Sequence, residues 1–205
     1  MTTLSDGFLG DGFHDIPAGR LTAIVTHLEM REAAAPRPVP APENATLLRV
    51  ERPETGWYRD LFTRIGALDW LWYSRLSLDD AALAAILHDP AVEVYALDRD
   101  GQAIGLLELD FRQPGACELA FFGLTPEAIG GGAGRYLMNR AIDLAWARPI
   151  RLFHVHTCTL DHPGALGFYI RSGFTPVRQQ IEVAPDPRLS GLLPETAGPH
   201  VPLFR

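Results

Sequence analysis

Four glycines stand within five positions of the stretch PEAIGGGAGRYLM: Gly130, Gly131, Gly132 and Gly134. They directly precede what reads as a helix. A helix amino terminus presents unpaired main-chain N–H groups and a partial positive charge, so it binds anions and phosphates above all. Glycine removes the side chains that would stand between those N–H groups and a diphosphate, and it permits positive φ angles. The loop therefore predicts a phosphate-bearing ligand, with a flexible connector as the alternative.

Two familiar phosphate loops do not match this stretch. The dinucleotide pattern GxGxxG would need glycine where Arg135 or Leu137 stands, and it should follow the first strand of a parallel unit. The Walker loop requires a lysine, whereas all 18 basic residues of the chain are arginine. The absence of lysine also excludes a lysine Schiff base and a pyridoxal phosphate site.

Titratable side chains gather in a later stretch, at His154, His156, Asp161 and His162. His154 and His156 alternate along a predicted strand and so share one face, and histidine can exchange a proton near neutral pH. Alternate histidines on a strand can bind zinc, but the HxxxH and paired-cysteine spacings of zinc sites are missing. We therefore expect no metal site.

Two marks in the chain carry a resemblance to a known family. The segment ELAFFGLTPEAIGGGAGRYLMNRAIDLAW contains a GxG core, and HPGALGFYIRSGF follows about 30 residues later. Together they resemble the GCN5-related N-acetyltransferase (GNAT) family, whose coenzyme A loop reads Q/R-x-x-G-x-G/A. The second mark of that family reads N-x-x-A-x-x-x-Y-x-x-x-G-F. The resemblance covers residues 46–183.

Most positions of the two marks match, and two depart. Ile129 stands where glutamine or arginine is usual, which matters little because the diphosphate contacts in such a loop come chiefly from main-chain N–H groups. His162 replaces the usual asparagine, and we expect it to start the helix at Pro163. The matching residues are Gly132, Ala133 and Gly134 in the first mark and Ala165, Tyr169, Gly173 and Phe174 in the second.

The resemblance implies acetyl-CoA as cosubstrate and transfer of its acetyl group to a primary amine of a small molecule or peptide, by direct attack in a ternary complex. The strand before the loop would diverge from the next strand, and its free main-chain groups would bind the pantetheine arm and polarise the acetyl carbonyl. The residues implied to bind the cosubstrate are Phe122, Gly123, Leu124, Gly130, Gly131, Gly132, Ala133, Gly134, Arg135 and His162.

The resemblance also implies catalytic groups. Tyr169 would protonate the departing thiolate, and its alternative role is packing against the sheet. Glu118, on the strand before the loop, would act as the base directly or through water. The alternatives for the base are Glu108, Asp110, His154, His156 and water.

Two other functions remain open, namely a non-catalytic acyl-CoA-binding or sensing module on the same fold and a nucleotide-binding α/β protein. The acceptor is not readable from the sequence. Trp70, Trp72 and Tyr73 could line its pocket or form part of the core, and the net charge of −7 leans towards cationic acceptors.

The elements that must position these residues form an α+β fold, with a mixed, mostly antiparallel sheet flanked by helices and one right-handed strand-helix-strand crossover. Asp100-Gly101 is a strong hairpin signal, and Ser77 with Asp80 resembles a capping box before a helix that stops at Pro90. We predict strands over 20–32, 46–54, 92–99, 102–112, 116–124, 150–160 and 174–183, and helices over 56–68, 77–90 and 163–173. A further helix is predicted after the glycines, where an apolar stripe falls at helical spacing on one face: Leu137, Met138, Ala141, Leu144 and Ala145.

The 205 residues suit one domain with extensions. We divide them into an extension over 1–45, with the strand 20–32 and a proline-rich linker, a GNAT domain over 46–183, and a Pro- and Gly-rich tail over 184–205. The acidic balance argues against a nucleic acid partner. Without an apolar run for a membrane span or a signal peptide, we expect a cytoplasmic protein with two unpaired cysteines. The resemblance adds a possible homodimer.

Overall fold

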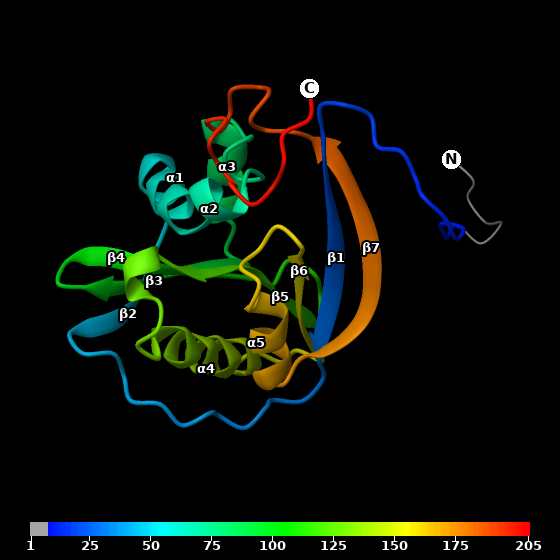
Figure 1. Cartoon of the computed structure of the whole chain (residues 1–205). Helices are drawn as coiled ribbons and strands as arrows, with labels where there is room; N and C mark the ends of the chain where they lie inside the picture. Colours follow the sequence, from blue (N-terminus) through cyan, green and yellow to red (C-terminus); the bar gives the residue numbers. More distant parts are fainter. Residues whose placement is uncertain (1–7) are drawn as a thin grey trace.

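The computed structural model describes residues 8–205, which form one mixed sheet with the strand order β2-β3-β4-β5-β6-β1-β7 (Figure 1). Neighbouring strands are antiparallel except for β5 and β6, which run parallel and are joined through α4. The fold predicted from the sequence is thereby confirmed. The strands are β1 (Arg20–Met30), β2 (Ala45–Arg49), β3 (Val92–Arg99), β4 (Gln102–Asp110), β5 (Ala116–Leu124), β6 (Leu152–Cys158) and β7 (Thr175–Pro185).

The helices lie on the two faces of the sheet. Figure 1 shows α1, α2 and α3 on one face and α4 and α5 on the other. A π-helical segment, η1, continues α1 into α2, and a short 3-10 turn, η2, precedes the glycine loop. Their bounds are α1 (Thr55–Phe62), η1 (Thr63–Ala67), α2 (Leu68–Trp70), α3 (Asp80–Leu87), η2 (Pro126–Ala128), α4 (Ala133–Trp146) and α5 (Ala165–Arg171).

Each face of the sheet has its own hydrophobic core, because side chains alternate along the strands. On β4, Leu106 packs towards α1 and α3, whereas Leu107 packs towards α4 and α5. The predicted apolar stripe of α4 is buried in the second of these cores, with Leu137 and Ala141 fully inaccessible. These two cores hold β4 and β5 between the two layers of helices.

The hairpin between β3 and β4 turns at Asp100 and Gly101, as predicted. Both residues have positive φ angles, 54° and 83°, which is the conformation that a tight hairpin requires. The main-chain N–H of Gly101 donates to Oδ1 of Asp98 at 2.9 Å. The local sequence therefore determines this turn by itself.

The predicted start of the second helix was wrong. Asp79 caps α3, since its Oδ1 accepts a hydrogen bond from the main-chain N–H of Ala82 at 2.8 Å. Ser77 instead donates its hydroxyl to the carbonyl oxygen of Ser74. Aspartate caps helices as well as serine does. Asp79, two residues after Ser77, therefore takes the capping position, and the helix begins at Asp80.

The strand β1 lies inside the sheet, between β6 and β7. His27 pairs with His156 on one side and with Arg178 on the other. The strand predicted over 20–32 therefore lies within the protomer's own sheet. The division of the chain into an extension, a domain and a tail remains a prediction.

The tail after β7 is irregular, as expected, yet it has fixed contacts. A buried ion pair joins Arg188 to Asp186 at 2.7 Å, and the same guanidinium donates to the carbonyl oxygens of Ala197, Val201 and Pro202. The main-chain N–H of Gly198 donates to the carbonyl of Leu68 in α2. Across residues 8–205, the helices lack the combination of length and apolar composition that crossing a bilayer requires.

Candidate functional site

The sheet opens between β5 and β6. Their parallel pairing covers only the first residues of β5, and ends where Glu118 lies opposite His154. From Leu119 to Leu124, β5 remains paired with β4 alone. Ala120 is an extra residue in that ladder, because Leu109 pairs with Leu119 while its neighbour Glu108 pairs with Phe121. A bulge of this kind bends a strand, so β5 turns away from β6 and exposes main-chain groups on that side.

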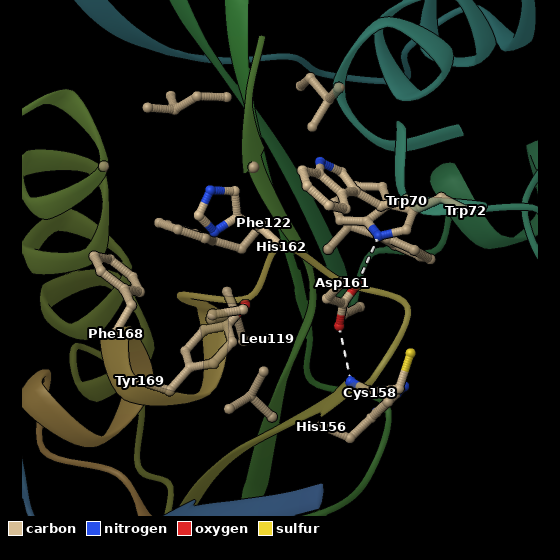
Figure 2. Close-up of a pocket in the computed structure, with 18 of the residues that line it drawn as sticks. Trp70, Trp72, Leu119, Phe122, His156, Cys158, Asp161, His162, Phe168 and Tyr169 are labelled. Carbon is tan, nitrogen blue, oxygen red and sulfur yellow. Dashed lines mark hydrogen bonds between the residues drawn. The ribbon is translucent and has the colours of Figure 1, made fainter. Parts of the chain in front are cut away.

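A cavity of about 690 Å³ fills this opening. Figure 2 shows Phe122, Phe168 and Tyr169 on one side of it and Trp72 and Asp161 on the other. The first group comes from β5 and α5, and the second from the segment after α2 and from the turn after β6. The remaining charged or polar lining includes Arg75, Asp110, Arg112, Glu118, His156, His162, Arg171 and Glu182.

The glycine loop lies at the end of the cavity where α4 begins. Gly130 and Gly132 have φ angles of 99° and 87°, which side-chain-bearing residues rarely adopt. A Cβ atom on Gly130 or Gly131 would meet nothing within 4 Å, so the main chain of the loop faces open space. Ala133 begins a helix of 14 residues, whose N–H groups and dipole favour an anion here. The observed loop fits a phosphate ligand.

Gly123 is required by a close approach within the cavity wall. A Cβ atom at this position would lie 2.4 Å from Cγ2 of Ile65 in η1. The main chain of β5 therefore sits directly against the π-helical segment. This contact holds the free edge of β5, from Phe122 to Leu124, along the floor of the cavity.

The proline-rich linker is fixed beside the glycine loop and passes along α4 in Figure 1. The side chain of Asn139 makes two hydrogen bonds with the main chain of Arg37, of 2.7 and 3.1 Å. Arg135 donates to the carbonyl oxygen of Pro38 at 3.3 Å, and Val39 lies 3.0 Å from the Cβ position of Gly132. This role of the linker was not foreseen from the sequence.

Glu118 and His156 form a pair in the cavity wall, with Oε1 and Nδ1 3.3 Å apart. The hydrogen bond to His156 is the main reason why the pKa of Glu118 is lowered. The same bond raises the pKa of His156 above its ordinary value. Glu118 is therefore ionised at neutral pH, and His156 presents its other nitrogen, Nε2, as the atom available for proton exchange.

Tyr169 lines the same cavity and is almost fully buried. Its ring packs edge-on against Phe122, Phe168 and Phe174. Burial, and then the charge of Asp161, raise the pKa of Tyr169. The phenol thus stays protonated at physiological pH and can donate a hydrogen bond. The side chain thus packs among aromatic residues and also lines the cavity, and its role as a proton donor stays a prediction.

His162 lies between the two sides of the cavity in Figure 2. Its Nδ1 accepts a hydrogen bond from the main-chain N–H of Gly164 at 2.9 Å, so a neutral His162 carries its proton on Nε2. The carbonyl oxygen of His162 accepts from the N–H of Ala165, the first residue of α5. Its ring also meets Trp70 edge-on, with centroids 5.2 Å apart. His162 therefore shapes the entry to the helix while it lines the cavity.

Asp161 holds the cavity together, and the sequence reasoning missed this role. Its carboxylate accepts hydrogen bonds from Nε1 of Trp72 at 3.0 Å, from the hydroxyl of Thr157 at 2.7 Å and from the main-chain N–H of Cys158 at 2.9 Å. Gly66 leaves the space that the Trp72 ring occupies, since a Cβ there would come within 2.1 Å of it. An aspartate directly before the HPG turn was the available signal.

The other candidate bases have partners of their own. Glu108 is fully buried and accepts hydrogen bonds of 2.5 Å from the hydroxyl of Tyr58 and from Arg75. Asp110 lines the cavity in an ion pair of 2.5 Å with Arg112.

The remaining residues singled out in the sequence lie apart from one another. His154 faces a smaller second cavity, and Tyr73 donates to Glu182 at the edge of the main one. Cys117 and Cys158 are both free thiols. Within residues 8–205, no group of histidine, cysteine and carboxylate side chains is arranged to hold a metal ion.

Comparisons with known proteins agree on one family. Residues 55–174 match the model described as the acetyltransferase (GNAT) family. A solved GCN5-related N-acetyltransferase from Sphaerobacter thermophilus superposes with a TM-score of 0.61 at 14% identity, over 80% of this chain and 51% of that chain. A tandem GNAT protein from the clavulanic acid biosynthesis pathway gives 0.56 at 14% identity, over 78% and 53%.

An aminoglycoside acetyltransferase from an uncultured soil metagenomic sample, in complex with sisomicin, gives a TM-score of 0.53 at 13% identity, over 63% of this chain and 87% of that chain. At such identities the likeness concerns the fold. The chain spans about half the length of the Sphaerobacter and clavulanic acid pathway proteins. No curated protein sequence gives a significant match.

Proposed function

The chain belongs to the GNAT family of acetyltransferases, and we propose that it transfers an acetyl group from acetyl-CoA to a primary amine of a small molecule or peptide. The observation that carries this proposal is the opening between β5 and β6, which joins a glycine loop at the start of α4 to a cavity with titratable side chains. Such an arrangement suits a long ligand with a diphosphate at one end and a reactive group at the other.

In this proposal the diphosphate of acetyl-CoA binds the main-chain N–H groups of residues 130–135. The pantetheine arm extends along the free edge of β5 from Leu124 to Phe122, as an added strand would. A main-chain N–H of that edge donates to the acetyl carbonyl oxygen and stabilises the negative charge that develops there. His162, at the entry to α5, completes the wall beside the arm.

The Glu118–His156 pair is our candidate for the base. Most amines are protonated at neutral pH and must lose a proton before or during attack on the thioester carbon. The pair can accept that proton at Nε2 of His156, while the carboxylate of Glu118 stabilises the imidazolium that results. In this assignment His156 accepts the proton, and Glu118, which was the predicted base, stabilises the protonated imidazole.

Tyr169 is our candidate for the proton donor. When the bond between the acetyl carbon and sulphur breaks, the thiolate that leaves needs a hydrogen bond or a proton. A buried phenol whose pKa is raised is protonated throughout the physiological range and can provide one. Its ring is held by Phe122, the residue at which the arm would end.

Charge in the cavity favours a cationic acceptor. Of the three arginines that line the cavity, Arg75 and Arg112 are each paired with a carboxylate and Arg171 is not, as far as residues 8–205 are concerned. Within the same residues, Glu182 and Asp161 accept hydrogen bonds only from neutral donors, so two unpaired carboxylates face one unpaired arginine. The ring of Trp70 adds an aromatic wall that attracts ammonium groups. We therefore propose amines that carry further positive charge, such as polyamines and aminoglycosides, as the first acceptors to test.

The test is calorimetric titration with CoA followed by a thiol-release assay with acetyl-CoA and a panel of amines. The proposal predicts binding of CoA and release of free thiol with at least one amine. Binding without turnover on any amine, together with no effect of Tyr169→Phe on thiol release, would favour an acyl-CoA-binding module. Preferential thermal stabilisation by NAD or ATP over CoA would favour a nucleotide-binding protein. We also propose a cytoplasmic location, which cell fractionation tests.

A further inference from the structure

The strand β7 forms one end of the sheet and pairs only with β1 among the described strands (Figure 1). Its residues from Thr175 to Val183 are all exposed, on both faces of the strand. The outer edge of β7 therefore presents a row of main-chain N–H and carbonyl groups to solvent. Long exposed edges of this kind are templates for pairing with another strand.

The sequence of β7 is complementary to itself in the antiparallel direction. The stretch VRQQIEV, residues 177–183, is arranged about Gln180, with valine at both ends and one charge of each sign two residues from the centre. Arg178 and Glu182 are the only charged residues of the strand. Of all antiparallel registers between two copies of β7, one alone places each of these two charges opposite the other.

We propose that the free edge of β7 pairs with the same edge of a second copy of this chain, across a twofold axis at Gln180. In this register Arg178 lies opposite the partner's Glu182 and Gln179 opposite the partner's Ile181, and each pair occurs twice. Val177 is an extra residue in the ladder with β1, because His27 pairs with Arg178 and Leu28 with Pro176, so the regular pairing begins at Arg178. Such an interface is isologous and closes on itself. Pro176 and Pro185 lack an N–H group and flank the paired segment, which limits how far the strands can slip.

Exposed apolar side chains lie on one face of the same ribbon. Ile24 of β1 pairs directly with Ile181 of β7, and both are about half exposed, as are Val177 and Val183. In the proposed register Ile24, Ile181 and Val183 of the two copies form an apolar stripe on one face of the joined sheet, since residues 181 and 183 share a face by the period of two and Ile24 pairs with Ile181. Such cross-strand contacts add to the main-chain pairing.

The proposed partner also reaches the candidate site. Glu182 lines the cavity and accepts a hydrogen bond of 3.3 Å from the hydroxyl of Tyr73. Opposite Glu182, the partner's Arg178 would stand at the mouth of that cavity and neutralise one of its carboxylates. Each site would then be completed by the other copy. This inference concerns the assembly and does not depend on which acceptor the enzyme uses.

The experiment is sedimentation velocity of the full chain over a range of concentrations. The wild type is expected to be dimeric, and Arg178→Glu and Glu182→Arg should each weaken dimerisation at least about 10-fold, because each places like charges opposite one another twice. Arg140→Glu, on the surface of α4, reverses an equivalent arginine away from β7 and should leave the dimer intact.

Combining the two charge-reversed variants distinguishes the proposed register from other interfaces. An equimolar mixture of the Arg178→Glu and Glu182→Arg variants should form a heterodimer, since both cross-strand pairs are then of opposite sign. The double variant should regain the wild-type dimer for the same reason. A wild type that is monomeric at every concentration, a dimer unaffected by either single variant, or a mixture that fails to associate would each overturn the proposal.

Discussion

Oε1 of Glu118 lies 3.3 Å from Nδ1 of His156, across the point where β5 and β6 cease to pair. The register of the two strands places Glu118 directly opposite His154, so the carboxylate reaches the imidazole two residues farther along β6, at the wall of the opening. A carboxylate that holds one nitrogen of an imidazole leaves the other free for proton exchange.

This relationship predicts a specific pH dependence. His156 must be neutral to accept a proton, so kcat/KM should fall as the pH decreases through the raised pKa of His156. Glu118→Gln removes the charge and weakens the hydrogen bond that raise this pKa. The acid limb of the profile should therefore move to lower pH, and kcat should decrease by about 10-fold or more. His154→Gln, on the neighbouring cavity, is the control. An acid limb that does not move in Glu118→Gln would contradict the role of the pair.

Tyr169→Phe should separate proton donation from packing. The aromatic contacts with Phe122, Phe168 and Phe174 remain in the variant, so its melting temperature and its affinity for CoA should change little. The loss of the hydroxyl should lower kcat by roughly 100-fold. Tyr95→Phe removes another buried hydroxyl, which donates to Glu93 away from the cavity, and it should leave kcat unchanged. Equal kcat values for Tyr169→Phe and wild type would show that the tyrosine only packs.

Asp161→Ala should act on the acceptor side of the cavity. Trp72, Thr157 and Cys158 each lose a hydrogen bond to the carboxylate, and leaving such groups without a partner costs roughly 1–3 kcal/mol. The indole of Trp72 then loses its anchor, so its fluorescence should change and the KM for the amine should rise more than the KM for acetyl-CoA. A rise confined to acetyl-CoA would place Asp161 beside the cosubstrate instead.

Arg188→Met should destabilise the tail and, with it, the part of the cavity wall that α2 forms, because the tail is hydrogen-bonded to α2. The variant leaves the carboxylate of Asp186 buried without its ion pair, which costs about 3–5 kcal/mol. Thermal unfolding should show this loss. Arg205→Met removes an exposed ion pair with Glu195 in the same tail, and it should change the melting temperature much less. Similar melting temperatures for the two variants would mean that the buried pair does not stabilise the fold.

Much of the fold was predictable because its signals are local. The alternation of β5, the Asp100-Gly101 turn and the apolar stripe of α4 each specify one element within a few residues. The glycine loop was also predictable from local sequence, since adjacent residues determine its conformation. These elements fix where β5 ends and α4 begins, and therefore the end of the cavity where we propose that the diphosphate binds.

The remainder depends on contacts between distant parts of the chain. The place of β1 between β6 and β7 follows from pairing with residues more than a hundred positions away, which no local pattern encodes. The joining of Glu118 to His156 depends on the register of two strands, and the anchoring of Trp72 by Asp161 depends on how η1 packs on β5. Tertiary register thus decided which of several candidate carboxylates and histidines came together.

Gly131 provides the most direct test of the account, because it lies in the glycine loop without a positive φ angle and a Cβ there would meet nothing within 4 Å. Substitution at this position should therefore leave the free protein unstrained. Gly56, in the first turn of α1, shares both properties outside the cavity and is the matched control. The measurement is calorimetric titration of CoA into wild type, Gly131→Glu and Gly56→Glu.

If main-chain N–H groups of the loop bind the diphosphate, a carboxylate at position 131 should block and repel it. Gly131→Glu should then weaken CoA binding at least about 100-fold, a loss of about 2.7 kcal/mol, with an unchanged melting temperature. Gly56→Glu should bind as the wild type does. Wild-type affinity for CoA in Gly131→Glu would contradict the central claim.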